Sequence, residues 1–430
     1  MASILYKNAL ILKGEDFTPL NGFLGTAGTL IDYIGTERPE AAYDQEIDLK
    51  GAILLPALFN AHTHAAMTLL RGLGGGLPLE RWLNERIFPT EARLTPAMVS
   101  AGNALALLEM LACGTVSFTD MYDFPQTAVE LCLNGGMKIN TGRPYMCFDE
   151  NEKLSDSYRI REALALYDAY HQAGDGRVLI DFDLHAVYTN KKHGIQGFSE
   201  LVREKGGRLN IHLSETQTEV GDCLKAYGMT PPALFASLGA FKNPTTAAHC
   251  VHVTPADREI LRENGVFPVH NPTSNMKLVS GMSPVDGMLK QGIRVALGTD
   301  GTASNNNLNM FEEMHLAALM AKLQTGDAEA LPARSVLTMA TRNGALSQGR
   351  EDSGVLEVGF RADLCAVSLE APHLYPVLDP AELLVYSAQG SDVTLTVCDG
   401  KILYRDGEYL TLDKEKILYE ARAAVKALYA

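Results

Sequence analysis

The residues with the clearest chemical potential lie in the stretch NAHTHAAMTLLRG, residues 60–72, where two histidines stand two positions apart. His62 and His64 follow the apolar run AILLPALF (52–59), whose length and composition are typical of a fully buried strand. Because alternate residues of a strand point to the same side, both imidazoles would project together from its C-terminal end. Such a pair can hold a metal ion, although two hydrogen-bonded histidines closing a strand are the commoner outcome for an isolated pair.

The surrounding pattern predicts the elements that position this pair. Between Pro56 and about Gly349, strand-like bursts alternate with stretches that carry apolar residues at helical spacing. The helical stretches include residues 97–112, 158–171, 284–290 and 308–323. With the burst before His62, eight strands alternate with helices, which predicts an α/β fold of the (β/α)8 TIM-barrel type. Active sites of such barrels lie at the C-terminal ends of the strands.

The two ends of the chain share a different style, with short apolar bursts separated by turn residues. Examples are ILYKNALIL near the N-terminus and VTLTVCDGKILY near the C-terminus. We therefore expect residues 1–55 and 354–430 to pair into one small β-sandwich domain, with an amphipathic helix over residues 413–428. Residues 56–353 would form the barrel.

Other predicted strand ends supply partners for the first histidine pair. NIHLSET brings His212 and Glu215, AAHCVH brings His249, and ALGTDG brings Asp300. Imidazoles and a carboxylate without a nearby thiolate suit zinc or another divalent ion such as iron or manganese. A catalytic zinc keeps one position open for water, so we interpret the site as hydrolytic.

Composition narrows the choice of partners. The 37 basic and 52 acidic residues give a net charge of −15, which argues against a nucleic-acid backbone or an anionic membrane as partner. The seven cysteines are scattered and contain no C-x-x-C pair, which indicates neither a disulfide framework nor a cysteine-rich zinc site. The N-terminal residues do not resemble a signal peptide, and no apolar run has the length of a membrane helix, so we expect a cytoplasmic protein.

Five motifs carry a resemblance to a known family. They are PALFNAHTHAAMTLLRG, HLSET, AAHCVH, NPTSNMKL and LGTDGTASNNNLNMFEEM. From about residue 53 to its end the chain resembles the amidohydrolase superfamily, and most closely its 5′-methylthioadenosine/S-adenosylhomocysteine deaminase branch. The long final motif is specific to that branch and its near neighbours.

The resemblance implies roles for the strand-end residues. His62, His64, His212 and Asp300 would hold one zinc ion, with His249 close to the reacting water. Glu215 matches the proton shuttle of the family, and a carboxyl group at that place can protonate the ring nitrogen of an aminopurine. Asp300 would also accept the proton of the water. The implied reaction is hydrolytic deamination of an adenosine derivative to the inosine analogue and ammonia.

The resemblance also implies substrate contacts. Glu91 falls where family members hold the ribose hydroxyls, and Arg143 matches the position that faces a carboxylate tail. His185 matches a purine-contacting histidine. The alternative for Glu91 is a solvated acid at a helix start, and for His185 a core histidine. Lys153 is the nearest candidate for a second cation near the tail, and a lysine offers a point charge instead of a bidentate fork.

Several alternatives stay open at this point. A binuclear relative would need a lysine at the end of strand four, where this chain has His185. Deaminases of guanine and hydrolases of chlorinated triazines share the metal ligands, but Glu91 and Arg143 favour a nucleoside over a bare heterocycle. A non-catalytic metal-binding relative is disfavoured because a structural metal has no use for Glu215. We also expect a homo-oligomer.

Overall fold

A parallel barrel forms the centre of the molecule. The computed structural model describes residues 2–430. The barrel strands are β6 (Leu58–Thr63), β7 (Thr115–Met121), β8 (Lys138–Gly142), β9 (Val178–Ile180), β10 (Phe182–Leu184), β11 (Leu209–Leu213), β12 (Thr245–His249), β13 (Phe267–His270) and β14 (Ala296–Leu297). They are almost entirely buried, as expected for parallel strands covered by helices.

The eight predicted barrel strands are present, but the fourth is interrupted. β6 to β9 form one parallel sheet and β10 to β14 another, and the break between them falls at Asp181. The chain still crosses the break in barrel fashion, because the Asp181 amide donates to the Thr141 carbonyl oxygen. On the far side the Asp300 amide donates to the His62 carbonyl oxygen and joins the end of β14 to β6. The TIM-barrel prediction is confirmed.

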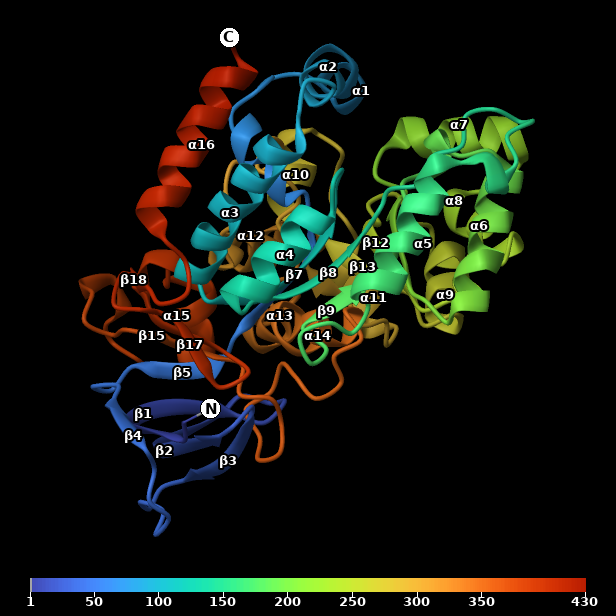
Figure 1. The fold of residues 1–430 in the computed structure, drawn as a ribbon. Coiled ribbons are helices and arrows are strands. Elements are labelled where there is room, and N and C mark those ends of the chain that lie inside the picture. The colour runs from blue at the N-terminus through green and yellow to red at the C-terminus, as the bar shows by residue number, and fades with distance from the viewer. Residues whose placement is uncertain (1) are drawn as a thin grey trace.

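Helices surround this barrel (Figure 1). The α-helices of this layer are α3 (Pro96–Ala112), α4 (Gln126–Gly135), α5 (Tyr158–Tyr170), α6 (Lys192–Lys205), α7 (Gln217–Tyr227), α8 (Pro231–Ser237), α9 (Pro255–Glu263), α10 (Pro272–Lys277), α11 (Val285–Lys290), α12 (Met310–Thr325), α13 (Ala333–Ala340) and α14 (Arg342–Ser347). The four helical stretches expected from spacing match α3, α5, α11 and α12 to within two residues at each end. Short 3-10 turns cover residues 65–70, 154–156, 187–189, 240–242, 372–374 and 390–392.

Strands from both ends of the chain form one further sheet. They are β1 (Ile4–Lys13), β2 (Thr18–Ala27), β3 (Leu30–Gly35), β4 (Gln45–Asp48), β5 (Ile53–Pro56), β15 (Leu364–Val367), β16 (Val393–Cys398), β17 (Lys401–Arg405) and β18 (Glu408–Tyr409). β5 joins the two ends by pairing with both β1 and β15. β3 returns to the residues before β15, where the Ile31 amide donates to the Phe360 carbonyl oxygen, so the sheet encloses a core of its own.

Two helices of the C-terminal region, one between β15 and β16 and one after β18, pack on the barrel helices. α15 (Pro380–Tyr386) packs on α12 and α13, and α16 (Lys414–Leu428) packs along α3, as Figure 1 shows at the C-terminus. Buried Ala421 and Leu428 of α16 share an apolar cluster with Leu70 and Val99. The C-terminal helix therefore covers the barrel instead of the β sheet from which it emerges.

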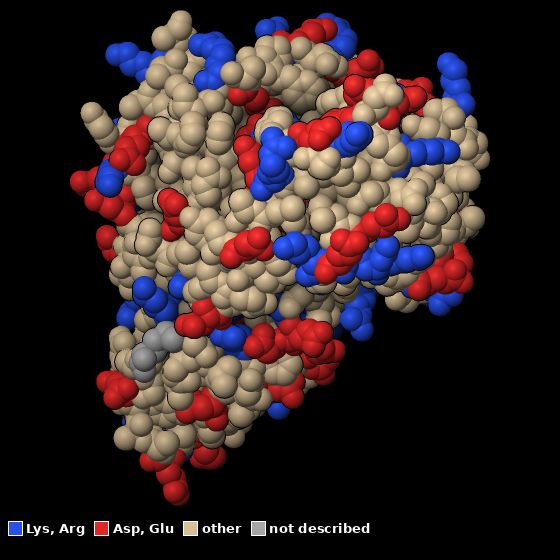
Figure 2. Space-filling model, turned by 45° about the vertical axis from the view of Figure 1, so that its right-hand side comes forward, with Lys and Arg blue, Asp and Glu red and all other residues tan. Residues whose placement is uncertain are grey.

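A helical segment projects over the C-terminal ends of the barrel strands. It comprises α1 (Leu79–Trp82), a π-helical turn at Leu83–Ile87 and α2 (Phe88–Glu91), and lies at the top of Figure 1. Among residues 2–430 no single helix is long and apolar enough to cross a membrane, and one pair, Leu79–Glu91 with Pro96–Ala112, meets the test only jointly and is bent by 115°. Figure 2 shows Lys and Arg side chains interspersed with Asp and Glu over the face in view.

Candidate metal centre and active-site cavity

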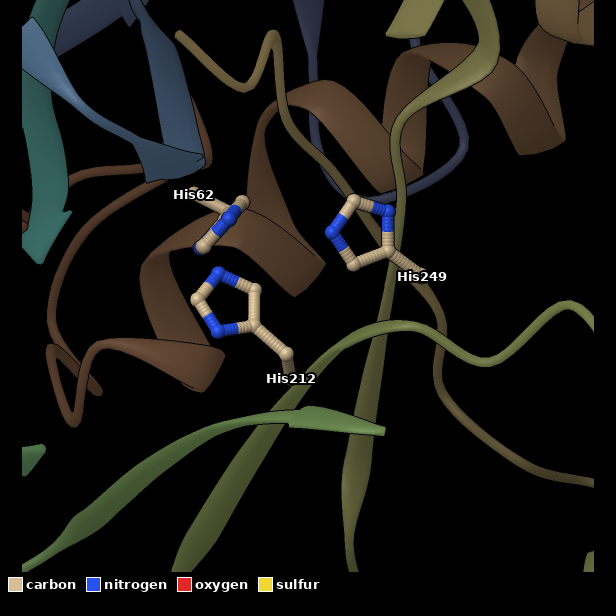
Figure 3. Close-up of side chains that lie close together, drawn as sticks. All are labelled: His62, His212 and His249. Atoms are coloured by element: carbon tan, nitrogen blue, oxygen red, sulfur yellow. The ribbon is translucent and has the colours of Figure 1, made fainter. Parts of the chain in front are cut away.

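Four histidines and one aspartate gather at the C-terminal ends of the barrel strands. Figure 3 shows the rings of His62, His212 and His249 facing one another, each from a different strand. The ring centroid of His62 lies 4.9 Å from that of His212 and 5.6 Å from that of His249. The register between β11 and β12 pairs Leu213 with His249, which brings the ends of these two strands to the same level. His64 lies 5.0 Å from His62, centroid to centroid.

The hydrogen bonds of His64 and His212 leave the lone pairs of their Nε2 atoms close to each other. The Nδ1 atom of His64 lies 2.6 Å from the Met121 carbonyl oxygen, and that of His212 lies 2.9 Å from the His185 carbonyl oxygen. A carbonyl oxygen only accepts, so both Nδ1 atoms carry the proton and both Nε2 atoms carry a lone pair. These two Nε2 atoms are only 3.4 Å apart. Two lone pairs at this distance are placed to share one cation, as in metal sites where a second group behind each histidine orients its ring.

His62 supports the same conclusion. Its side chain is fully buried, and neither ring nitrogen has a hydrogen-bond partner among residues 2–430. Burial, with the neighbouring His64 acting in the same direction, lowers the pKa of His62 well below its usual value, so the ring is in the neutral form that ligates metals. Donor atoms of His62, His64 and Asp300 lie within 4.8 Å of one another, and so do those of His62, His212 and His249. The residues present fit a divalent metal.

Asp300 is held rigidly beside these rings. One carboxylate oxygen, Oδ1, lies 3.3 Å from His64 Nε2 and accepts from the Gly301 amide at 2.7 Å. The other, Oδ2, accepts from the hydroxyl groups of Ser274 and Ser304. The backbone of Asp300 has φ of +61°, an uncommon conformation for a non-glycine residue and one found often at functional sites.

Glu215 and His249 form the other side of the centre. Oε2 of Glu215 lies 3.8 Å from His249 Nε2, and Oε1 accepts a hydrogen bond from Ser280 at 3.3 Å. His249 is oriented by Asn275, whose Oδ1 lies 2.9 Å from its Nδ1. Burial raises the pKa of Glu215, partly opposed by His249, so the acid form persists to higher pH than in an exposed glutamate. A carboxyl group tuned in this way can act as a proton donor.

A cavity of about 410 Å³ opens above the centre. His64, His212, His249, Glu215 and Asp300 line its inner end. Its walls are mainly apolar and aromatic and include Met67, Trp82, Phe88, Met121, Phe148 and Tyr188. Such a cavity suits a flat, partly apolar small molecule with a few polar groups at fixed places.

Two of the predicted substrate-contact residues lie on this cavity. Glu91, at the end of α2, faces it beside Tyr122, and burial raises the pKa of Glu91. His185 also lines it, and its Nδ1 lies 3.1 Å from the Thr189 hydroxyl. Burial, with smaller contributions from His64 and Arg159, lowers the pKa of His185 to about 3, so this ring is neutral.

The two predicted cations, Arg143 and Lys153, do not lie on the cavity wall. The guanidinium of Arg143 is paired with the carboxylates of Asp123 and Glu162, and Lys153 is exposed. Arg159, in the first turn of α5, lines the cavity instead, with Asp123 also on the wall. Its Nη1 donates to the Pro144 carbonyl oxygen at 3.0 Å and lies 3.6 Å from Asp123 Oδ1.

Sequence reasoning passed over Arg159, although the sequence carries a signal for it. A cation in the first turn of a helix opposes the helix dipole, which favours acidic side chains there. Arg159 follows the loop after the third barrel strand, on the face where barrel active sites are built. The helix dipole does not favour the positive charge of Arg159, and this residue lies on the face of the barrel where active sites are built. Together these two features indicate that Arg159 has a role in binding instead of in helix stability.

The fold and the centre define a class of protein: a (β/α)8-barrel hydrolase that uses a divalent metal at the strand ends. Residues 53–403 match the model of the Amidohydrolase family. The chain belongs to the amidohydrolase family.

Curated relatives match nearly the whole chain. The "5-methylthioadenosine/S-adenosylhomocysteine deaminase" of Thermoanaerobacter pseudethanolicus is 40% identical over 429 residues and covers 99% of both chains. The "5'-deoxyadenosine deaminase" of Methanosarcina mazei is 41% identical and covers 100% of this chain and 99% of its own. Among solved structures, a zinc-bound adenosine deaminase from Xanthomonas campestris superimposes with a TM-score of 0.93 at 32% identity, covering 99% of this chain and 98% of its own.

Proposed function

We propose that this protein is a zinc-dependent deaminase that hydrolyses the 6-amino group of an adenosine derivative. One observation carries the proposal: the buried carboxyl group of Glu215 lies beside the histidine and aspartate cluster at the inner end of an aromatic cavity. A metal site with a purely structural role has no use for a proton donor there. The names of the relatives and the zinc in one solved neighbour support the same reaction.

The metal ligands are assigned from the family resemblance of the strand-end motifs, and the donor atoms are compatible with this assignment. His62, His64, His212 and Asp300 would hold one zinc ion per chain, since they supply three neutral imidazoles and one carboxylate. When bound, the zinc supplies Lewis-acid chemistry and lowers the pKa of water at its open position. His249 lies next to this set and would orient the reacting water, because its Nδ1 is fixed by Asn275.

Proton movements are assigned to two carboxyl groups. Asp300 takes the proton of the attacking water, and its two serine hydroxyl partners keep its carboxylate in one orientation. Glu215 donates its proton to the ring nitrogen of the adenine next to the carbon that carries the amino group. Ser280 already donates to Oε1 of Glu215, so the proton to be transferred resides on Oε2. The amino group then leaves as ammonia with the proton that Asp300 took from the water. The proton of the new hydroxyl group returns to Glu215, so the carbonyl group of the inosine analogue forms and both carboxyl groups regain their starting protonation states.

The rest of the nucleoside is matched to the cavity wall. Glu91 would accept hydrogen bonds from the ribose hydroxyls, because a carboxylate can accept from two neighbouring hydroxyl groups. His185, held neutral, would contact the purine. The aromatic and methionine side chains of the outer wall suit an apolar substituent at the 5′ carbon.

Arg159 is expected to select substrates with a carboxylate tail. In Arg159→Gln, kcat/KM for S-adenosylhomocysteine should fall about 10-fold to 100-fold, because one charge-assisted hydrogen bond contributes roughly 1.5–3 kcal/mol. The value for 5′-methylthioadenosine, which has no carboxylate, should change by less than about threefold. Steady-state kinetics with both nucleosides measures the ratio.

Arg161 provides the matched control for this substitution. It lies two residues further along the same helix, is exposed, and donates to the carbonyl oxygens of Ser155 and Asp156. Arg161→Gln should leave both substrates unchanged. An equal fall in kcat/KM for both substrates in Arg159→Gln would show that Arg159 does not bind the carboxylate tail. A fall for S-adenosylhomocysteine alone in Arg143→Gln would show that Arg143 binds it instead.

A substrate panel tests the proposed function itself. Adenosine, 5′-methylthioadenosine, 5′-deoxyadenosine and S-adenosylhomocysteine are added in turn to the purified zinc-loaded protein, and the absorbance change from adenine to hypoxanthine is followed. Turnover of at least one is expected. Guanine and a chlorinated triazine serve as contrasts. Turnover of a contrast compound without turnover of any adenosine derivative would overturn the proposal.

The proposal also covers the domain division, the cellular location and the oligomeric state of the protein. The chain is proposed to divide into a barrel over residues 56–353 and a small domain built from residues 1–55 and 354–430. A cytoplasmic location and a homo-oligomeric state are proposed as well. Light scattering of the purified protein measures the oligomeric state directly.

A further inference from the structure

Glu219 makes an unusual helix cap directly behind Glu215. Thr216 is the N-cap of α7, and its hydroxyl oxygen accepts from the Glu219 amide at 3.1 Å. In an ordinary capping box the acidic side chain three residues on returns to the amide of the N-cap residue. Here the Glu219 carboxylate does not bind the amide of the N-cap residue. It accepts instead from the two preceding amides, those of Ser214 at 3.0 Å and Glu215 at 2.7 Å.

A second helix shows what the ordinary arrangement looks like in this molecule. At the start of α9, the Thr254 hydroxyl oxygen accepts from the Asp257 amide, and the Asp257 carboxylate accepts from the Thr254 amide at 2.9 Å. Asp257 is as buried as Glu219. The Asp257 carboxylate also accepts from the hydroxyl group of Thr230, the N-cap of α8. That cap therefore joins the starts of α9 and α8, whereas the Glu219 cap holds the turn that carries Glu215.

That turn is strained and needs support. Ser214 has φ of +51°, in the left-handed region that non-glycine residues rarely adopt. Its carbonyl oxygen accepts from the amides of Val251 and His252, which follow His249. With Glu219 on the amide side, the turn is fixed from both directions, and the Glu215 side chain leaves it toward His249.

We propose that Glu219 is a positioning residue, which holds the backbone of Ser214 and Glu215 so that the Glu215 carboxyl group stays in place for proton transfer. The inference rests on the proposed role of Glu215. Glu219 does not line the cavity, and its carboxylate is hydrogen-bonded to the backbone of Ser214 and Glu215, so we assign its effect on the reaction to the placement of Glu215. A misplacement of about 1 Å at a reacting group costs up to about 100-fold in rate, so loss of this support should be visible in kcat.

The test compares Glu219→Gln and Glu219→Ala with the matched variant Asp257→Asn in the zinc-loaded enzyme. Glu219→Gln should lower kcat about tenfold, Glu219→Ala should lower it further, and KM and zinc content should stay unchanged. Asp257→Asn should leave kcat unchanged. An equal loss of kcat in Asp257→Asn, or no loss in Glu219→Ala, would overturn the inference.

A double-mutant cycle with Glu215→Gln separates positioning from general destabilisation. If Glu219 acts through Glu215, adding Glu219→Gln to Glu215→Gln should cost no further activity, whereas independent effects would multiply. Multiplication would overturn the inference.

Amide hydrogen exchange gives a readout that needs no substrate. Exchange at Ser214 and Glu215 should accelerate in Glu219→Ala and stay as in the wild type in Asp257→Asn. Unchanged exchange would overturn the inference even in an active enzyme. An inactive wild type with accelerated exchange in Glu219→Ala would instead count against the proposed reaction and leave the positioning contact supported.

Discussion

Replacing Asp300 by asparagine should lower kcat by about three orders of magnitude and weaken metal binding. The substitution keeps the shape of the side chain but removes the negative charge beside His62 and His64. It also removes the base that takes the proton of the water. Metal content after dialysis, measured by atomic absorption, and kcat with the best nucleoside of the panel give the two results.

Metal removal provides the control for this prediction. A chelator should abolish turnover of the wild type, and added zinc should restore it, because three of the four proposed ligand side chains are held in place without the metal. His64 is held by Met121, His212 by His185, and Asp300 by Ser274 and Ser304. Zinc added to Asp300→Asn should not restore turnover. A variant that binds zinc as tightly as the wild type and keeps more than about a tenth of its activity would exclude Asp300 as ligand and base.

The residues of the centre could be predicted from the sequence because strand ends are local features. His62 and His64 follow one buried apolar run, and His212 follows another. The local sequence alone therefore predicts an imidazole at the carboxyl end of each strand. Parallel strands in a barrel present these ends on one face. The structure accordingly brings together all five groups that the sequence singled out at strand ends as metal or water partners: His62, His64, His212, His249 and Asp300.

The charged residues further from the centre could not be placed in this way. Arg143 follows a strand end, as expected, but the direction of its side chain is decided by Asp123 and Glu162, which lie on other elements. Which carboxylate a long side chain meets depends on tertiary contacts that spacing does not encode. The position of Arg159 on the cavity wall likewise depends on tertiary contacts, with the Pro144 carbonyl oxygen and with Asp123.

Two features of the fold were also outside what spacing can predict. The break in the fourth strand falls at Asp181, a buried carboxylate that accepts from Asn140, and no local signal distinguishes RVLIDFDLHAVYT from an unbroken strand. The amphipathic pattern of α16 indicates that one face is covered, but not what covers it. The structure shows that the cover is α3 of the barrel, which lies far from α16 in the sequence.

Glu215→Gln should lower kcat by at least about 100-fold while zinc stays bound. Glutamine has the size of glutamate, and its amide can still meet Ser280 and His249, so the fold and the metal ligands are left intact. It has no acidic proton to give to the adenine ring. Steady-state kinetics and metal analysis on the same preparation measure both quantities.

The pH dependence distinguishes loss of the proton donor from loss of a contact. Because burial raises the pKa of Glu215, the wild type keeps the acid form to higher pH, and its kcat/KM should decline as the pH rises through that pKa. In Glu215→Gln this decline should disappear, since the amide does not titrate. Ser280→Ala removes only the hydrogen bond to Oε1 and should retain the decline with a smaller loss of rate. If Glu215→Gln kept the wild-type rate and profile, the proton would have to come from another group, and His249, whose Nε2 lies 3.8 Å from Oε2, would be the first candidate.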